Sequence, residues 1–257
     1  MDNVDKKLLY FLLKDARMPL RKIAEELGIS AQALNYRMAK LYETGVIRKY
    51  SLHVNPKIYG KVNGFAAYKN DRYMSPNVIS KFKCLEEITI YEFAANTMEE
   101  LEDEIRKAET FAGLPIMKYI PEQRDMKMNI GETDRRILEY LKKDPRMSVV
   151  NLAKELGLAN SSVRKRINLM EKNHVIAATT EIDLSKTDIV LFSIISKNVR
   201  NLIPVITDQP ILVISDRDNG ILVCFSENLK QARYVIENSR KTDPSAEVMV
   251  VYDYEFN

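Results

Sequence analysis

The sequence of 257 residues is long enough for two or more compact units, each with a hydrophobic core of its own. Its 46% hydrophobic and 29% charged residues exclude a disordered chain, and no apolar stretch reaches the length that spans a bilayer. The first residues lack a signal-peptide pattern, so we expect a cytoplasmic protein without a membrane partner. Cys84 and Cys224 lie far apart without metal-ligand spacing, which favours buried thiols over a disulfide or a zinc site.

The net charge of +3 is unevenly distributed along the chain. Residues 1–60 carry a net charge of +5 and residues 131–185 a net charge of +2. Residues 61–130 and 186–257 each carry −2. The two basic blocks are therefore candidates for contact with a polyanion.

The two basic blocks also share a repeated sequence. After a shift of 129 residues, the segment 5–47 aligns with 134–176 without a gap, and 14 of the 43 positions are identical. Many other pairs exchange one apolar residue for another. The chain therefore contains one unit twice.

Each unit is predicted to be three helices followed by a strand. Apolar residues at helical spacing over 4–13 predict the first helix. Pro19 suits the first turn of a second helix, which Gly28 ends in a left-handed conformation. Ser30 caps a third helix, and 46–51 continues as a strand.

The second copy departs from the first in two places. Asn173 and His174 replace Gly45 at the end of the third helix, where we expect Asn173 to tolerate the left-handed conformation. The basic segment 48–50 becomes Ala-Ala-Thr at 177–179, so the second wing is predicted to carry less charge. On this pattern the first unit is expected to bind a polyanion more strongly.

Two short helices joined by a glycine-containing turn are typical of the helix-turn-helix, whose second helix enters the DNA major groove. With Leu34 facing the core, a step of about 100° per residue turns the polar side chains of the third helix outward. Amide and cationic side chains there suit base edges, whereas cations around them suit phosphates. The predicted DNA contacts of the first unit are Ser30, Gln32, Asn35, Tyr36 and Lys40, with Arg21, Lys22, Arg48 and Lys49 for phosphates. Those of the second unit are Ser161, Arg164, Lys165 and Asn168.

Other interpretations of these residues remain open. Arg37 and Arg166 lie beside the buried face, where pairing with Asp5 and Asp134 is favoured over a phosphate contact. Tyr36 could pack on a neighbouring side chain in place of a base. The whole unit could also be a winged helix that contacts protein.

The motifs of the first unit resemble the N-terminal domain of the Lrp/AsnC (feast/famine) transcription regulators. They are Asp2-x-x-Asp5-x-x-Leu8-Leu9, Asp15-x-Arg17, Ile23-Ala24-x-x-Leu27-Gly28-Ile29-Ser30 and Arg37-x-x-x-Leu41-x-x-x-Gly45-Val46-Ile47. The second copy is similar but departs at Ala159 and at 173–174. In that family a winged helix-turn-helix precedes a βαββαβ ferredoxin-like domain that dimerises and binds amino acids. The resemblance implies double-stranded DNA as the partner and an amino acid as a candidate effector. We expect no cofactor.

The sequence after residue 186 follows that pattern. It predicts strands and helices in the order β-α-β-β-α-β, with Asn219-Gly220 as a hairpin signal. The predicted strands are 189–195, 211–214, 221–225 and 247–252, and the predicted helices are 199–207 and 227–240. The segment 216–220 is interpreted as a plain hairpin turn in preference to an effector loop.

The sequence between the two units predicts a smaller lobe. Its expected strands are 65–69, 88–93 and 116–120, and its expected helices are 77–84 and 97–109. The predicted fold is therefore α+β, with two winged helix-turn-helix units alternating with two ferredoxin-like lobes, the first shortened by a strand. The proposed boundaries are 1–60, 61–130, 131–185 and 186–257.

Because both units lie in one chain, we expect the lobes to pack as the family's dimer does. The resulting single-chain pseudo-dimer would read an imperfect palindrome, and pairing of two pseudo-dimers remains open. One alternative is an adaptor without DNA binding. Another is an enzyme like the tetrapyrrole decarboxylases that resemble this family, which would need clustered His, Tyr and Arg side chains. His53 and His174 lie on different predicted wings and no catalytic motif is present, so we do not expect an enzyme.

Overall fold

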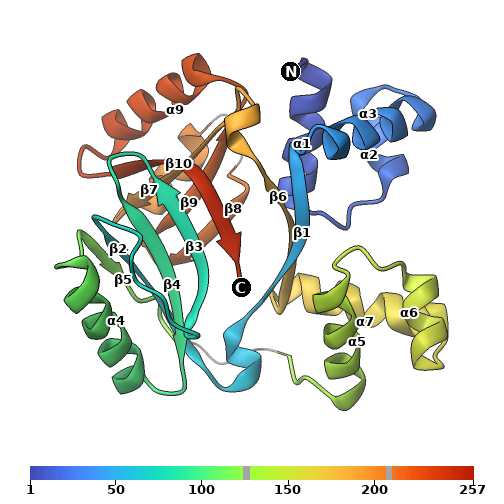
Figure 1. Cartoon of the computed structure of the whole chain (residues 1–257), viewed down its shortest axis with the longest axis horizontal. Helices are drawn as coiled ribbons and strands as arrows, with labels where there is room; N and C mark the ends of the chain where they lie inside the picture. The colour runs from blue at the N-terminus through green and yellow to red at the C-terminus, as the bar shows by residue number, and fades with distance from the viewer. Residues whose placement is uncertain (124–127, 207–209) are drawn as a thin grey trace.

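The computed structural model describes residues 1–123, 128–206 and 210–257, and it divides the chain into a helical half and a sheet half (Figure 1). The helical half contains the two predicted three-helix units. The first is made of α1 (Asn3–Lys14), α2 (Leu20–Leu27) and α3 (Ala31–Glu43). The second is made of α5 (Glu132–Lys143), α6 (Val149–Leu156) and α7 (Asn160–Lys172). The duplication read from the sequence is therefore also a duplication of structure.

The strand that follows each third helix pairs with its counterpart from the other unit. β1 (Ile47–Val54) and β6 (Ile176–Ile182) form an antiparallel two-stranded ribbon. The first helix of the first unit packs on β6, where the Ala16 amide donates to the Ala178 carbonyl at 2.9 Å. The two predicted wings are thus the two strands of one shared ribbon, which joins the units.

Most helix ends follow the chemistry expected from the sequence. Gly28 ends α2 with φ of 64°, and the Ser30 hydroxyl accepts a hydrogen bond from the Ala33 amide at the start of α3. The end of α7 differs from the prediction. His174, and not Asn173, takes the left-handed conformation, with φ of 55°. In the aligned copies His174 occupies the position of Gly45, and the turn requires a positive φ there.

The sheet half is one antiparallel sheet in the order β5-β2-β4-β3-β10-β7-β9-β8. The first lobe supplies β2 (Val62–Tyr68), β3 (Val78–Cys84), β4 (Thr89–Ala95) and β5 (Met117–Tyr119). The second supplies β7 (Val190–Ser196), β8 (Leu212–Asp216), β9 (Asn219–Ser226) and β10 (Glu247–Phe256). Within each lobe the strands lie in the ferredoxin-like order of fourth, first, third and second. The lobes join edge to edge where β3 pairs with β10.

The prediction that the first lobe is short of a strand is wrong. The segment expected to be a helix, 77–84, is β3, and the described segment 69–77 before it contains no helix. Buried Glu104 on α4 (Met98–Ala112) holds that irregular segment. Its carboxylate accepts hydrogen bonds from the Tyr73 hydroxyl at 2.6 Å, the Asn77 amide at 3.2 Å and the Ser75 hydroxyl. The first lobe therefore keeps four strands and lacks the first helix.

The second lobe matches its prediction more closely. The helix predicted over 199–207 corresponds to α8 (Val199–Leu202) and the 3-10 turn η3 (Ile203–Val205), while residue 207 itself lies outside the described residues. α9 (Leu229–Thr242) is the second helix. The hairpin is confirmed by the pairing of Asp216 with Asn219. Helices α8 and α9 cover one face of this lobe, and α4 covers one face of the other.

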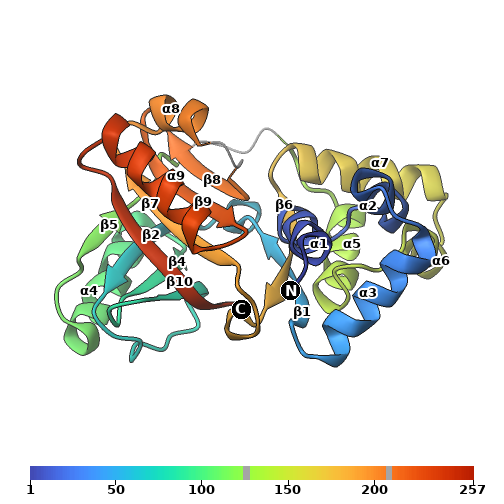
Figure 2. The same cartoon turned by 90° about the horizontal axis from the view of Figure 1, so that it is seen from above.

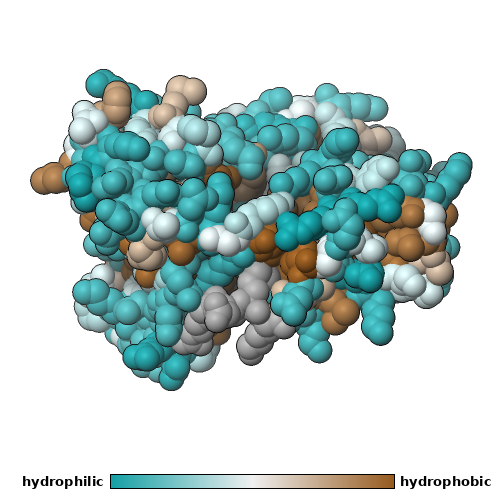
Figure 3. Space-filling view, turned by 90° about the horizontal axis from the view of Figure 1, so that it is seen from below, coloured by the Kyte–Doolittle hydropathy of each residue, from teal (hydrophilic) through white to brown (hydrophobic). Residues whose placement is uncertain are grey.

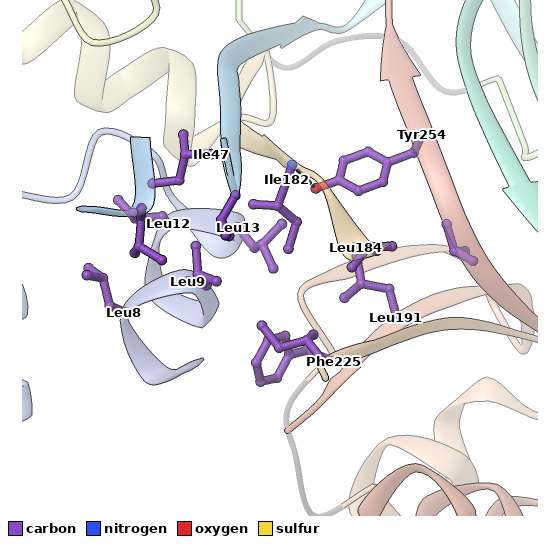
Figure 4. Close-up of a cluster of buried hydrophobic side chains, with 14 of the residues drawn as sticks. Leu8, Leu9, Leu12, Leu13, Ile47, Ile182, Leu184, Leu191, Phe225 and Tyr254 are labelled. Carbon is purple, nitrogen blue, oxygen red and sulfur yellow. Dashed lines mark hydrogen bonds between the residues drawn. The ribbon is translucent and has the colours of Figure 1, made fainter. Parts of the chain in front are cut away.

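The opposite faces of both lobes share a core with α1 (Figure 4). Leu8, Leu9 and Leu12 are fully buried there, and the rings of Tyr10 and Phe225 lie 5.4 Å apart. The second unit has a separate core, into which Ile58 of the 3-10 turn η1 (Pro56–Tyr59) inserts from the linker. The first unit is therefore continuous with the lobes, and the second is packed mainly on itself.

Both cysteines are buried, as predicted, and burial raises the pKa of the Cys84 thiol to about 12. Across the described ranges, no helix is long and apolar enough to cross a membrane. The same residues contain no group of three or more His, Cys, Asp or Glu side chains that could hold a metal ion.

Candidate nucleic-acid interface

The two candidate recognition helices lie on opposite flanks of the helical half. α3 and α7 are each the second helix of a helix-turn-helix, and α1 and α5 lie between them (Figure 2). The same separation is visible in Figure 1.

The predicted base-reading side chains of the first unit are exposed on α3. They are Gln32, Asn35, Tyr36 and Lys40. Tyr36 is 70% exposed, so it does not pack on a neighbouring side chain. The Ser30 hydroxyl serves as the N-cap of α3, and α2 exposes Lys22 together with Arg21, which pairs with Glu25 at 2.9 Å.

The corresponding residues of the second unit are exposed on α7 and more basic. They are Ser161, Arg164, Lys165 and Asn168. Arg164 and Lys165 are adjacent, and within the described part of the chain neither forms an ion pair. These two positions align with Asn35 and Tyr36 of α3, so the two helices present different chemistry at equivalent places.

The arginine beside each recognition face has a structural role, as favoured from the sequence. The Arg37 guanidinium donates to Asp5 at 2.7 Å and to Asp2 at 2.6 Å. Arg166 donates to Asp134 at 2.9 Å. Each pair ties the third helix of a unit to its first helix.

The two basic residues of the first wing have partners inside the chain. Arg48 pairs with Asp253 at 2.8 Å and donates to the Tyr254 carbonyl at 3.0 Å. Lys49 lies 3.2 Å from the carboxylate of Glu181, which is almost fully buried. Their placement therefore gives no support to their predicted role as phosphate contacts.

These pairings change the electrostatic ranking of the two units. The ion-paired cations of the first unit are Lys6, Arg17, Arg21, Arg37, Arg48 and Lys49. Among the described residues 131–185, Arg166 is the one cation in an ion pair. The first unit has the larger formal charge, but the second leaves more of its cations available to an external anion.

Two residues that join the units were not selected from the sequence, although both are among the identical positions of the repeat. The Arg17 guanidinium crosses to the second unit and donates to the carbonyls of Pro145 at 2.7 Å and Met147 at 3.1 Å. Arg146 crosses in the other direction, donating to the Tyr50 hydroxyl at 2.9 Å with its guanidinium 4.9 Å from the ring centre. Together with the ribbon, these contacts hold α3 and α7 in a fixed relation.

The helical units match a family described as winged helix-turn-helix DNA-binding, over residues 1–48 and 130–177. A 60-residue segment is 38% identical to the HTH-type transcriptional regulator FL11 of Pyrococcus furiosus. It covers 23% of this chain and 40% of that protein. A segment of the same length is 45% identical to the HTH-type transcriptional regulator LrpA of Pyrococcus horikoshii, covering 23% of this chain and 43% of that protein. The chain thus spans about two fifths of the curated relatives it matches.

Solved structures give a similar comparison at low identity. The siroheme decarboxylase NirDL aligns over 98% of this chain and 92% of its own, with a TM-score of 0.48 and 15% identity. LrpC of Bacillus subtilis aligns over 50% of this chain and 99% of its own, with a TM-score of 0.35 and 18% identity. TM-scores and identities this low carry no argument about the activity of this chain. Both helical units of this chain thus match the winged helix-turn-helix model, and one unit that resembles those of Lrp/AsnC-type regulators is present twice in a single chain.

Proposed function

We propose that this protein is a sequence-specific DNA-binding transcription regulator that acts as a single-chain pseudo-dimer. The observation that carries the proposal is the pair of exposed recognition helices with unlike polar faces, joined by one ribbon and by the crossing arginines. In helix-turn-helix dimers, two such helices read half-sites about one DNA turn apart. Here one chain supplies both recognition helices, so the two halves of its DNA site need not have the same sequence.

The side chains indicate what each half-site contains. Gln32 and Asn35 on α3 are amides, which bind bidentately to adenine in the major groove. Arg164 and Lys165 on α7 suit the two acceptors of guanine. We therefore expect an imperfect palindrome with adenine at the base pairs read by α3 and guanine at those read by α7.

Selection from random duplex DNA tests the proposal directly. The expected result is one enriched site with two unlike halves whose centres lie about 10 base pairs apart. Gln32→Ala is expected to relax the adenine positions and Lys165→Ala the guanine positions of the other half. A strictly symmetric consensus would contradict the pseudo-dimer. No shifted band with sheared genomic DNA at low salt would contradict DNA binding and leave a role in protein contacts.

A further inference from the structure

A pocket of about 180 Å³ lies where the ribbon, the linker, the first lobe and the second helix-turn-helix unit meet. On the face seen from below, hydrophobic surface collects along the junction of the two halves (Figure 3). The lining residues used below are His53 of β1, Tyr59 of η1, Lys61, Ile79 of β3, Lys142 of α5 and Phe256 of β10. The pocket contains no residue of the β8–β9 turn.

All ionisable side chains among the residues that line this pocket are basic. They are His53, Lys61 and Lys142, and the described residues of the lining include neither Asp nor Glu. The Lys142 ammonium lies 5.0 Å from the ring centre of Tyr59, which holds it at the pocket. The Glu92 carboxylate offsets the charge of His53, so Lys61 and Lys142 supply the excess positive charge around this partly open pocket, which favours an anionic occupant.

A buried carboxylate behind His53 favours the charged form of its imidazole. Its Nε2 lies 3.3 Å from Glu92, which also accepts hydrogen bonds from the Ser80 hydroxyl at 2.7 Å and the Asn63 amide at 3.0 Å. Burial acts to lower the pKa of His53, but the charge and hydrogen bond of Glu92 outweigh it and raise that pKa. Burial would raise the pKa of Glu92, yet His53 and the two polar neighbours keep it below its usual value. The imidazolium side chain, 30% exposed, then has a second N–H for a ligand.

The volume limits the size of the occupant. A cavity of about 150 Å³ accommodates benzene, whereas pockets for drug-sized molecules begin at about 300 Å³. A ligand of about six to ten non-hydrogen atoms therefore fits. Ile79 of the first lobe and Phe256 of the second provide the apolar wall, on the paired strands β3 and β10.

We propose that this pocket binds a small organic monocarboxylate, with its charge between His53, Lys61 and Lys142 and its apolar body against Ile79 and Phe256. Such a ligand would connect α5 of the second unit to the linker and to the first lobe. The site does not depend on the proposed DNA binding, and its test uses no DNA.

The imidazole NMR signals of the full chain provide the test, because the protein has two histidines and His174 lies outside the pocket. Benzoate is the probe, and benzamide is the uncharged control of the same shape. Benzoate is expected to shift the His53 signals with a dissociation constant on the order of 1 mM or tighter, leaving the His174 signals in place. An unmoved His53 signal at about 10 mM benzoate, or equally tight binding of benzamide, would overturn the proposal.

Two lysine variants locate the anion. Lys61→Met and Lys142→Met keep the apolar stem of the side chain and remove its charge. Each is expected to weaken benzoate binding about tenfold without changing the weak response to benzamide. Lys197→Met, at an exposed lysine outside the lining, is the matched control and should leave binding unchanged. Unchanged benzoate affinity in both pocket variants, with native His174 signals, would refute the assignment.

Discussion

The two helix-turn-helix units have the same helices and 14 identical positions of 43, yet their charges are used differently. In the first unit six cations pair with carboxylates, including Arg48 with Asp253 and Lys6 with Asp188 in the distant second lobe. In the second unit Arg164 and Lys165 remain exposed on α7. The repeat therefore preserved the fold of the unit, while one copy became anchored to the lobes and the other kept a basic face.

The hydrophobic cores show the same contrast. The first unit shares its core with both lobes, through leucines of α1 that meet Leu191 and Phe225. The core of the second unit is its own, apart from Ile58 and neighbouring residues of the linker and ribbon. A substitution in the core of the first unit should therefore destabilise the lobes as well, whereas the equivalent substitution in the second unit should act mainly on that unit.

The largest expected effect comes from truncating one equivalent buried leucine in each core. Leu12 and Leu141 align in the repeat, and both are fully buried. Either Leu→Ala change should cost about 2–5 kcal/mol locally. By amide hydrogen exchange, Leu12→Ala should weaken protection in the first unit and both lobes, whereas Leu141→Ala should weaken it mainly over 131–182. The same exchange pattern in both variants would contradict the difference between the cores.

DNA affinity should be the next most sensitive property. Removing Arg164 and Lys165 together should relax the guanine positions of one half-site and lower affinity about 10- to 100-fold at low salt. Because both charges would also lie close to the phosphates that flank the groove, the slope of log K against log salt should become shallower. The aligned double variant Asn35→Ala, Tyr36→Ala is the control. It should change base preference and leave the salt slope in place. If both double variants showed the same slope of log K against log salt, α7 would not be the more basic DNA-binding helix.

Substitutions at the two helix N-caps should have smaller effects on the free energy of unfolding, of opposite sign in the two units. Ser30 caps α3 through its hydroxyl, whereas the aligned Ala159 leaves α7 without a side-chain cap. Ser30→Ala should destabilise the protein by about 1 kcal/mol, and Ala159→Ser should stabilise it by a similar amount. Urea unfolding measures both. A loss of stability in Ala159→Ser would mean that α7 begins with a geometry unlike that of α3.

The smallest effect is expected at the wing. Arg48 and Lys49 are partly exposed and ion-paired, so Arg48→Ala and Lys49→Ala should each cost less than about 1 kcal/mol of stability. Neither is expected to change the salt dependence of DNA binding strongly, because each charge is already paired with a carboxylate of the chain. A flatter salt slope in either variant would show that the ribbon contacts DNA after all.

Much of the fold could be predicted from local patterns. Helical periodicity predicts all three helices of each unit and the exposed residues of α3 and α7. Short apolar runs predict the four strands of the second lobe. The segment 77–84 was misread because its eight residues fit either periodicity. It is a strand because β4 and β10 supply partners on both sides, and the second of these lies about 170 residues away along the chain.

Which charges face outward depended on the tertiary structure. Periodicity along one helix predicts the face a side chain takes, because neighbouring turns define that face. It carries no information about a partner brought in from elsewhere, such as Asp253 beside Arg48. The repeat thus predicts two recognition helices. The long-range pairing of strands and charges decides that α7, in the second unit, has the more basic exposed face.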